Sequence, residues 1–237
     1  MRIKPISAVP PGVRWALAAT LALQLLWHAA QPARRPKADA LAAAPPLAVL
    51  RLASLGEPLA LSKAMLLYLQ AFDEQDGVSL SLNRLDYGRV ESWLEAALAL
   101  DPRSQYPLLA ASEVYGAAGD PARVRRMGDF VARHFEEDPR RRWPWLAHAA
   151  LVAKHRLHDL PLARRYAQAI RRRADGPDVP AWARELEVFV LEDMNELDSA
   201  RALIGGLLQS GQVTDPHELA FLERRLEQMA ARPSVAP

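Results

Sequence analysis

The segment "LDYGRVESWLEAALALDP", Leu85 to Pro102, decides the fold of this chain. Its apolar residues recur at spacings of three, four and seven, which places them on one side of an α-helix. Asp86 stands where a helix would begin, and an aspartate there accepts hydrogen bonds from the free amide groups of the first turn. Val90 follows one turn later, on the side that a neighbouring helix would cover. The segment therefore predicts a helix that starts after Asp86, packs along one face and ends before Pro102.

The same pattern returns along the chain. Prolines follow helical stretches at positions 102, 139, 177 and 216, separated by 37, 38 and 39 residues, a spacing typical of helix-hairpin repeats. The stretches "GDPARV" from Gly119, "HDLPLA" from His158 and "NELDSA" from Asn195 align with the start of the first helix. Each combines an acidic residue with a small or β-branched residue four positions later. These pairs are Asp86 and Val90, Asp120 and Val124, Asp159 and Ala163, and Glu196 and Ala200.

The repeat predicts two kinds of helix. The four helices that follow the acidic residues are named B helices, and each has a buried apolar stripe. Each is preceded by a predicted A helix, and a last amphipathic helix closes the array, as the end of a helical repeat requires. The predicted A helices are Leu59 to Asp73, Gln105 to Ala118, Trp143 to Leu157 and Ala181 to Met194, and the closing helix is His217 to Ala231.

Two further segments belong to this region. The first A helix is apolar almost all round, so we expect it to be covered on most sides, partly by a short amphipathic helix within Pro46 to Gly56. The insertion from Asp73 to Leu85 is the longest break between predicted helices, and it is either a plain connector or a loop that contacts a partner.

The segment from Leu85 to Pro102 resembles the second helix of a tetratricopeptide repeat, with its acidic residue, the small residue four positions later and the proline twelve after that. "NELDSARAL", from Asn195, matches the same turn and helix start. The resemblance covers roughly residues 58–211 and is specific in the B helices. It implies an all-α fold, a right-handed superhelical array of helix hairpins or solenoid, whose concave face binds peptides or partner proteins. The family carries no catalytic residues to transfer.

The stretch "VRWALAATLALQLLWHAA", Val13 to Ala30, predicts a single transmembrane helix. As a helix it would rise about 27 Å, close to the thickness of the hydrocarbon core of a bilayer. Trp15 and Trp27 lie near its two ends, where indole rings favour the membrane interface. A cleaved signal peptide and a buried core helix are the alternatives. Cleavage after Ala30 would put His28 at the first recognition position, and cleavage after Ala44 would put Pro45 just beyond the cut. Flanking prolines isolate the segment from the rest of the chain.

These features predict five parts of the chain. They are an amino-terminal tail at residues 1–12, the transmembrane helix at 13–30, a tether rich in proline and alanine at 31–46, the repeat domain at 47–231 and a disordered tail at 232–237. We expect a single-pass protein of a bacterial inner membrane. The short basic tail before the membrane helix favours a repeat domain on the non-cytoplasmic side.

Composition narrows the possible chemistry. Among 237 residues there is no cysteine, which excludes disulfides, thiolate nucleophiles and sulfur-ligated zinc. The net charge of +2 gives the whole chain no strong attraction to nucleic acid. No nucleophile elbow, phosphate-binding glycine loop or dinucleotide fingerprint is present. The sequence therefore predicts neither an enzyme, nor a cofactor, nor a small-molecule substrate.

One histidine cluster allows a different interpretation. His148, His155 and His158 are separated by seven and three residues, so a helix would bring them toward one side. Metal sites on helices favour histidines four apart, or three apart together with a carboxylate. We predict no metal site here, and a metal-binding protein or metal-dependent enzyme that uses this cluster stays the alternative. An exported, periplasmic binding protein with a cleaved amino terminus is the other.

Charge is unevenly distributed. From Arg123 to Arg173 there are fourteen arginines and lysines against five acidic residues, whereas from Ala174 to Ala231 twelve acidic residues face four arginines. A basic region in the middle repeats predicts an acidic protein or peptide partner, or anionic lipid. The predicted partner-binding residues are Arg126, Arg140, Arg141, Arg142, Trp143, Trp145, His148 and His155. The function predicted from the sequence is a membrane-anchored scaffold for protein interactions.

Overall fold

The computed structural model describes residues 10–30, 39–75, 78–211, 213 and 215–230. The chain forms two units: one contains helix α1 (Pro11–Ala30), and the other contains the remaining helices. Within the described residues, the only strands are β1 (Glu74–Gln75) and β2 (Val78–Ser79), which pair in a two-stranded sheet. The prediction of an all-α fold is confirmed. The predicted disordered tail at 232–237 lies outside the described residues.

The helices of the larger unit follow the predicted alternation. The B helices are α4 (Tyr87–Leu100), α6 (Pro121–Phe135), α8 (Leu160–Arg173) and α10 (Leu197–Gln209). The A positions hold α3 (Pro58–Ala71), α7 (Pro139–His155), α9 (Ala181–Asp193) and the closing α11 (Pro216–Ala230). The second A position is divided into α5 (Tyr106–Leu109), the π-helical turn η3 (Ala110–Val114) and the 3₁₀ turn η4 (Tyr115–Ala117). The short α2 (Leu47–Ala53) precedes α3, and η2 (Leu82–Arg84) precedes α4.

Three of the four acidic residues cap their B helices as predicted. The Oδ1 atom of Asp86 accepts a 2.8 Å bond from the Gly88 amide, and Asp120 and Asp159 accept comparable bonds from their own first turns. Glu196 occupies the equivalent position without a capping bond, and its carboxylate binds Arg164 instead. All four residues one turn later are buried as expected, namely Val90, Val124, Ala163 and Ala200.

The A helices differ from the prediction in two places. Helix α7 begins at Pro139, four residues before the predicted start, so Pro144 lies inside the helix rather than in its first turn. Pro139 fits the first position because its missing N–H would have no partner there, which lets the helix start earlier. The second A helix is not continuous, since a π turn at Ala110–Val114 interrupts it. Such a turn inserts an extra residue and shifts the faces that follow.

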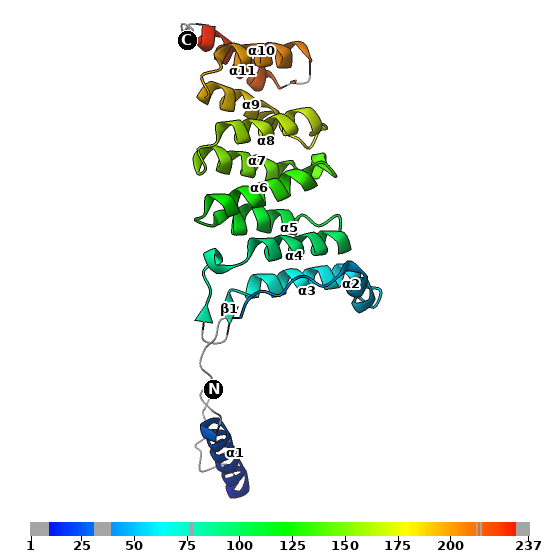
Figure 1. Ribbon diagram of the computed structural model, residues 1–237, viewed down its shortest axis with the longest axis vertical. Helices are drawn as coiled ribbons and strands as arrows, with labels where there is room; N and C mark the ends of the chain where they lie inside the picture. The colour runs from blue at the N-terminus through cyan, green and yellow to red at the C-terminus, as the bar shows by residue number, and fades with distance from the viewer. Residues whose placement is uncertain (1–9, 31–38, 76–77, 212, 214, 231–237) are drawn as a thin grey trace. The chain divides into compact units, whose positions relative to one another are not determined.

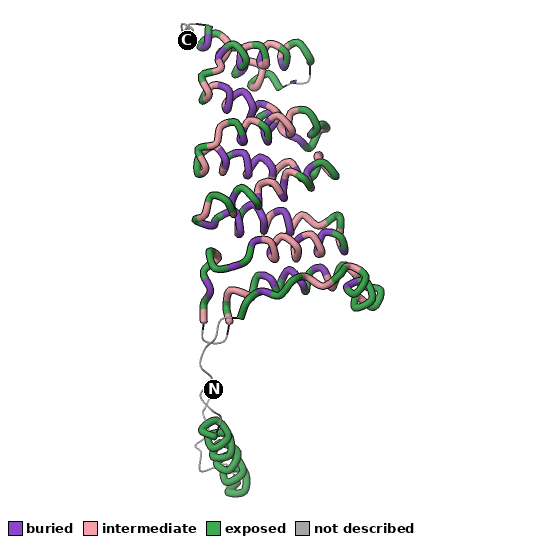
Figure 2. The backbone as a smooth tube through the Cα atoms, in the orientation of Figure 1, coloured by how far each residue is buried: buried purple, intermediate pink, exposed green. Residues whose placement is uncertain are grey.

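Helices adjacent in the chain pack against one another, from α3 on α4 through α6 on α7 and α7 on α8 to α10 on α11 (Figure 1). One apolar cluster extends from Leu41 to Val190, and a second one joins α9, α10 and α11. Buried residues concentrate in the helices from α4 to α9, whereas α1 is exposed along its length (Figure 2). Burial of these apolar stripes is the main favourable term for a fold of this kind.

The part of the predicted tether that the structure describes, residues 39–46, does not behave as a free linker. Leu41 is buried in the larger cluster, and its carbonyl oxygen accepts a hydrogen bond from Arg89. The Trp93 indole donates to the carbonyl of Ala42 at 2.9 Å. The helical unit therefore begins near Asp39. The remaining tether residues, 31–38, lie outside the described part of the chain.

The predicted cover over the first A helix is incomplete. Leu50 of α2 packs with Met65 and Leu100, but one side of α3 stays exposed, including Leu67 and Tyr68. Helix α2 is too short to reach over this side, because it ends at Ala53. An apolar surface is therefore left open at this end of the unit.

Helix α1 has no buried residue. Within the described ranges, no single helix combines the length and the mean hydropathy expected of a membrane span. The pair α2 and α3 meets that criterion only when taken together, and the two helices are bent by 112°. Arg14, Gln24 and His28 account for the modest hydropathy of α1, since each interrupts its apolar sequence.

Candidate functional site: the exposed face of the A helices

The A helices lie in one row. The Tyr115 hydroxyl of η4 donates to the Leu69 carbonyl of α3 at 3.3 Å. The Trp145 indole of α7 donates to the side-chain oxygen of Gln105 at 2.9 Å, just before α5. The ring of Trp143 meets that of Trp182 on α9 edge to face, with centroids 5.3 Å apart. Successive A helices thus contact one another directly, which brings their outer sides together in one surface.

The B helices form a second row. The Tyr166 hydroxyl of α8 donates to Asp129 of α6 at 2.8 Å, and Arg164 of α8 binds Glu196 at the start of α10 at 2.9 Å. Burial and the Asp129 charge both raise the pKa of Tyr166 above its usual range, so this hydroxyl remains a donor. These contacts join residues 32 to 37 positions apart, which is one repeat.

One side of α7 presents a regular stripe. Arg141, Pro144, His148, Leu151 and His155 follow one another at spacings of three and four, the spacing of neighbours on one helix face. Each is exposed or half-buried, and the alanines on the opposite side of α7 are buried. We call this surface the stripe of α7. It contains three of the predicted partner-binding residues.

The other predicted residues divide among different environments. Arg126 lies on B helix α6, in the other row. Arg140 is exposed and bonds the exposed Asp175 at 3.0 Å. Trp143 and Trp145 are half-buried in the seams between A helices, where they pack rather than project. The eight residues therefore do not form one site.

Arg142 is the clearest departure from the prediction of a basic contact surface, because it is 1% exposed. Its guanidinium donates to the carbonyl oxygens of His134 at 2.5 Å and Pro102 at 2.7 Å. It also binds Glu137 at 2.6 Å. Burial alone would raise the pKa of Glu137, but the bond from Arg142 and the contact with His134 lower it below its ordinary value. Arg142 joins three segments inside the fold and is not available to a partner.

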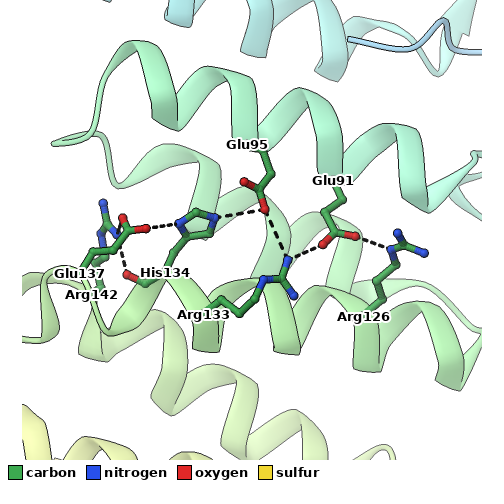
Figure 3. Close-up of polar contacts among 7 residues, drawn as sticks. All are labelled: Glu91, Glu95, Arg126, Arg133, His134, Glu137 and Arg142. Carbon is green, nitrogen blue, oxygen red and sulfur yellow. Dashed lines mark hydrogen bonds and ion pairs between the residues drawn. The ribbon is translucent and has the colours of Figure 1, made fainter. Parts of the chain in front are cut away.

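A polar chain continues from this residue across the B row (Figure 3). His134 lies 3.0 Å from Glu137 and 3.4 Å from Glu95 of α4. Glu91 of α4 binds both Arg126 and Arg133 of α6. The chain thus links α4, α6 and the start of α7, and it holds Arg126 in an ion pair between repeats.

Ion pairs within the fold also account for most of the basic residues between Arg123 and Arg173. These arginines and lysines bind a carboxylate, often of a neighbouring repeat. These pairs are Arg123 with Asp120, Arg125 with Asp159, Arg140 with Asp175, Arg141 with Asp138, Lys154 with Asp193, Arg164 with Glu196, Arg171 with Glu187 and Arg173 with Glu136. The local charge is thus largely balanced within the fold, which removes most of the support for an acidic partner.

The histidine cluster is not assembled into a metal site. His148 is half-buried on the stripe of α7, and His158 occupies the turn between α7 and α8 with a positive φ of 51°. The neighbouring carboxylate, Asp159, is occupied by the Leu162 amide and by Arg125. Within the part of the chain that the structure describes, no group of three or more histidine, aspartate or glutamate side chains is placed to hold a metal ion.

A small cavity lies where the π turn meets α6, α7 and α8. Its volume is about 10 Å³, and the buried hydroxyl of Ser112 has no hydrogen-bond partner in the described structure. This space accommodates about one water molecule and no organic ligand. It supplies no substrate pocket.

The exposed face of the A row continues beyond α7 with residues that the sequence analysis did not select. Trp182 and Phe189 of α9 and Phe221 of α11 are exposed or half-buried. Together with Leu151 they place apolar side chains on the same row of helices as the stripe of α7. The repeat period could have indicated them, because each lies on an A helix, but the concentration of histidines and arginines in α7 was the stronger local signal.

Comparison with known protein families, with curated proteins and with solved structures finds no match to this chain.

Proposed function

We propose that this chain is a membrane-attached, non-enzymatic scaffold whose helical unit is a tetratricopeptide-like solenoid that binds a partner protein or peptide. The array would be the right-handed superhelix of helix hairpins expected from the sequence. The single observation that carries the proposal is the row of A helices, which contact one another directly and carry exposed side chains on α7, α9 and α11. Direct contact between successive helices makes such a row a continuous surface, as extended partners require.

The chemistry of this surface favours protein binding over catalysis. Leu151 is 41% exposed, Trp182 48% and Phe221 38%, and large apolar or aromatic side chains anchor many protein interfaces. Arg141 and His148 add hydrogen-bonding groups on the stripe of α7. No pair of these residues has the arrangement of a nucleophile with its base, so binding is the function that the surface supports best.

Membrane attachment through α1 is supported by a different observation. Its apolar side chains are all exposed, including Trp15 at 76% and Trp27 at 69%, and a 20-residue helix rises about 30 Å. Exposed apolar surface of this extent requires a cover, which a bilayer supplies. We propose α1 as a single-pass anchor.

The anchor is tested by extracting membranes at alkaline pH. We expect the full chain to remain with the lipid and the double variant Leu23→Asp, Leu26→Asp to be released, because each aspartate at a helix centre costs about 3 kcal/mol of insertion. Gln24→Asn is the control and should stay in the pellet. Release of the unmodified chain would contradict the anchor, and a shortened intact mass would identify a cleaved amino terminus.

Partner binding is tested by purification from detergent-solubilised membranes. The unmodified chain should recover a reproducible partner, and Leu151→Glu should lose most of it because a charge is placed in the exposed apolar surface. Ala202→Glu is the matched control, since it adds the same charge to an exposed position of B helix α10. Equal recovery of the partner by the two variants would contradict a binding site on the exposed face of the A helices, which we call the A face.

A further inference from the structure

Helices α9 and α11 face each other through matched side chains. On α9, Glu185, Phe189 and Glu192 follow at spacings of four and three, and on α11, Glu218, Phe221 and Arg225 follow at three and four. Residues at such spacings share one side of a helix. The rings of Phe189 and Phe221 lie 6.3 Å apart.

The guanidinium of Arg225 binds the carboxylate of Glu192 through two nitrogen atoms, one of them at 2.8 Å. The aromatic pair joins residues 32 apart and this ion pair joins residues 33 apart. Both contacts therefore fix the same parallel register between α9 and α11. One turn earlier, that register places Glu185 opposite Glu218.

The pair Glu185 and Glu218 differs from the aromatic pair and the ion pair that follow it along the two helices, because it brings together two carboxylates. Glu185 is only 4% exposed, and its Oε1 atom has no hydrogen-bond partner within the described residues. Burial raises the pKa of Glu185 and the charge of Glu218 raises it further, while Arg184 acts in the opposite direction. A buried carboxylate without a partner is costly, and a positive group between the two would offset that cost.

The aromatic side chains around this pair suit the same kind of ligand. Trp182, which is 48% exposed, lies one turn before Glu185 on α9, and Phe221 lies one turn after Glu218 on α11. Faces of exposed indole and phenyl rings attract ammonium and guanidinium groups.

We infer that a lysine or arginine side chain of the partner segment binds at the half-buried Glu218 and offsets the negative charge of the buried Glu185 beside it. This inference rests on the proposed partner-binding function and specifies its chemistry: the carboxyl-terminal repeats recognise a basic residue. It replaces the acidic partner expected from the sequence, because the arginines of the middle repeats are largely paired within the fold, whereas the Oε1 atom of Glu185 has no hydrogen-bond partner among the residues that the structure describes.

The test uses the full chain in lipid nanodiscs and the blocked pentapeptide Ala-Ala-Lys-Ala-Ala, with its arginine and norleucine counterparts. The readout is the indole N–H resonance of Trp182, assigned with the variant Trp182→Phe. We expect the lysine and arginine peptides to shift this resonance saturably and the norleucine peptide to leave it in place. Glu218→Gln should weaken binding about tenfold, the effect of one lost charged hydrogen bond, and Glu185→Gln should weaken it through the loss of the second negative charge.

Glu223→Gln is the matched control. It removes one carboxylate from an exposed position of α11, off the side that carries Glu218 and Phe221, and should leave the affinity unchanged. Circular dichroism shows whether each variant is folded. Equal shifts with lysine and norleucine, or unchanged affinity in both acidic-pair variants, would overturn the inference. Because the probes are defined peptides, that failure is distinct from a failure to recover any partner from membranes, which would instead contradict the proposed function.

Discussion

Replacing Arg142 by methionine should lower the free energy of unfolding of the helical unit by about 3 kcal/mol. The methionine keeps much of the stem volume but cannot donate to the carbonyl oxygens of Pro102 and His134, which lose a charged donor. In a domain of this size the loss corresponds to a fall of roughly 10 °C in the midpoint of thermal unfolding. Denaturant titration followed by circular dichroism measures it directly.

Arg140→Met is the internal control, because Arg140 lies two residues earlier on the same helix. Its side chain is 66% exposed and its partner Asp175 is 76% exposed. Exposed ion pairs of this kind contribute little to stability. We therefore expect a much smaller change. Equal losses of unfolding free energy for the two variants would show that the bonds from Arg142 to the carbonyl oxygens of Pro102 and His134 do not stabilise the fold.

Replacing Ile204 by alanine should loosen the carboxyl-terminal helices while leaving the amino-terminal ones intact. Ile204 is fully buried in the cluster formed by α9, α10 and α11. Removing three carbons from such a site costs about 3 kcal/mol. When each repeat contacts only its neighbours, the cost is felt locally. Hydrogen exchange of the α10 and α11 amides should therefore accelerate by roughly a hundredfold, with that of α4 unchanged.

Leu94→Ala supplies the reciprocal variant, since Leu94 of α4 is equally buried but belongs to the larger cluster. It should accelerate exchange in α4 and its neighbours and spare α11. If either substitution accelerated exchange uniformly from α4 to α11, the helical unit would be one cooperative core and the nearest-neighbour account would be wrong.

The B helices could be predicted from the sequence because their signals are local. An aspartate that caps, an apolar stripe at helical spacing and a small residue one turn later act within a single helix, and Asp86, Asp120 and Asp159 all cap as expected. The π turn near Ser112 depends on packing between helices, and no pattern within a short window determines it.

The candidate site was harder to predict for the same reason. Counting charges along the sequence cannot show that Arg142 is buried or that Arg126 binds Glu91. Arg142 binds the carbonyl of Pro102 and Arg126 binds Glu91, and both of these partners belong to the preceding repeat. The stripe of α7 was partly found, through Arg141, His148 and His155. Glu185 was missed because nothing in its own segment, "AWARELEVFV", distinguishes a buried carboxylate from a solvated one.

The central claim is that a partner binds the A face of the helical unit, and photocrosslinking in intact membranes tests it most directly. A benzoylphenylalanine at Leu151 reports on the stripe of α7, and the same residue at Ala202 reports on B helix α10. We predict a discrete crosslinked product from position 151 that is absent from position 202. Equal labelling from both positions, or no product from position 151 in membranes that contain the folded chain, would contradict the account.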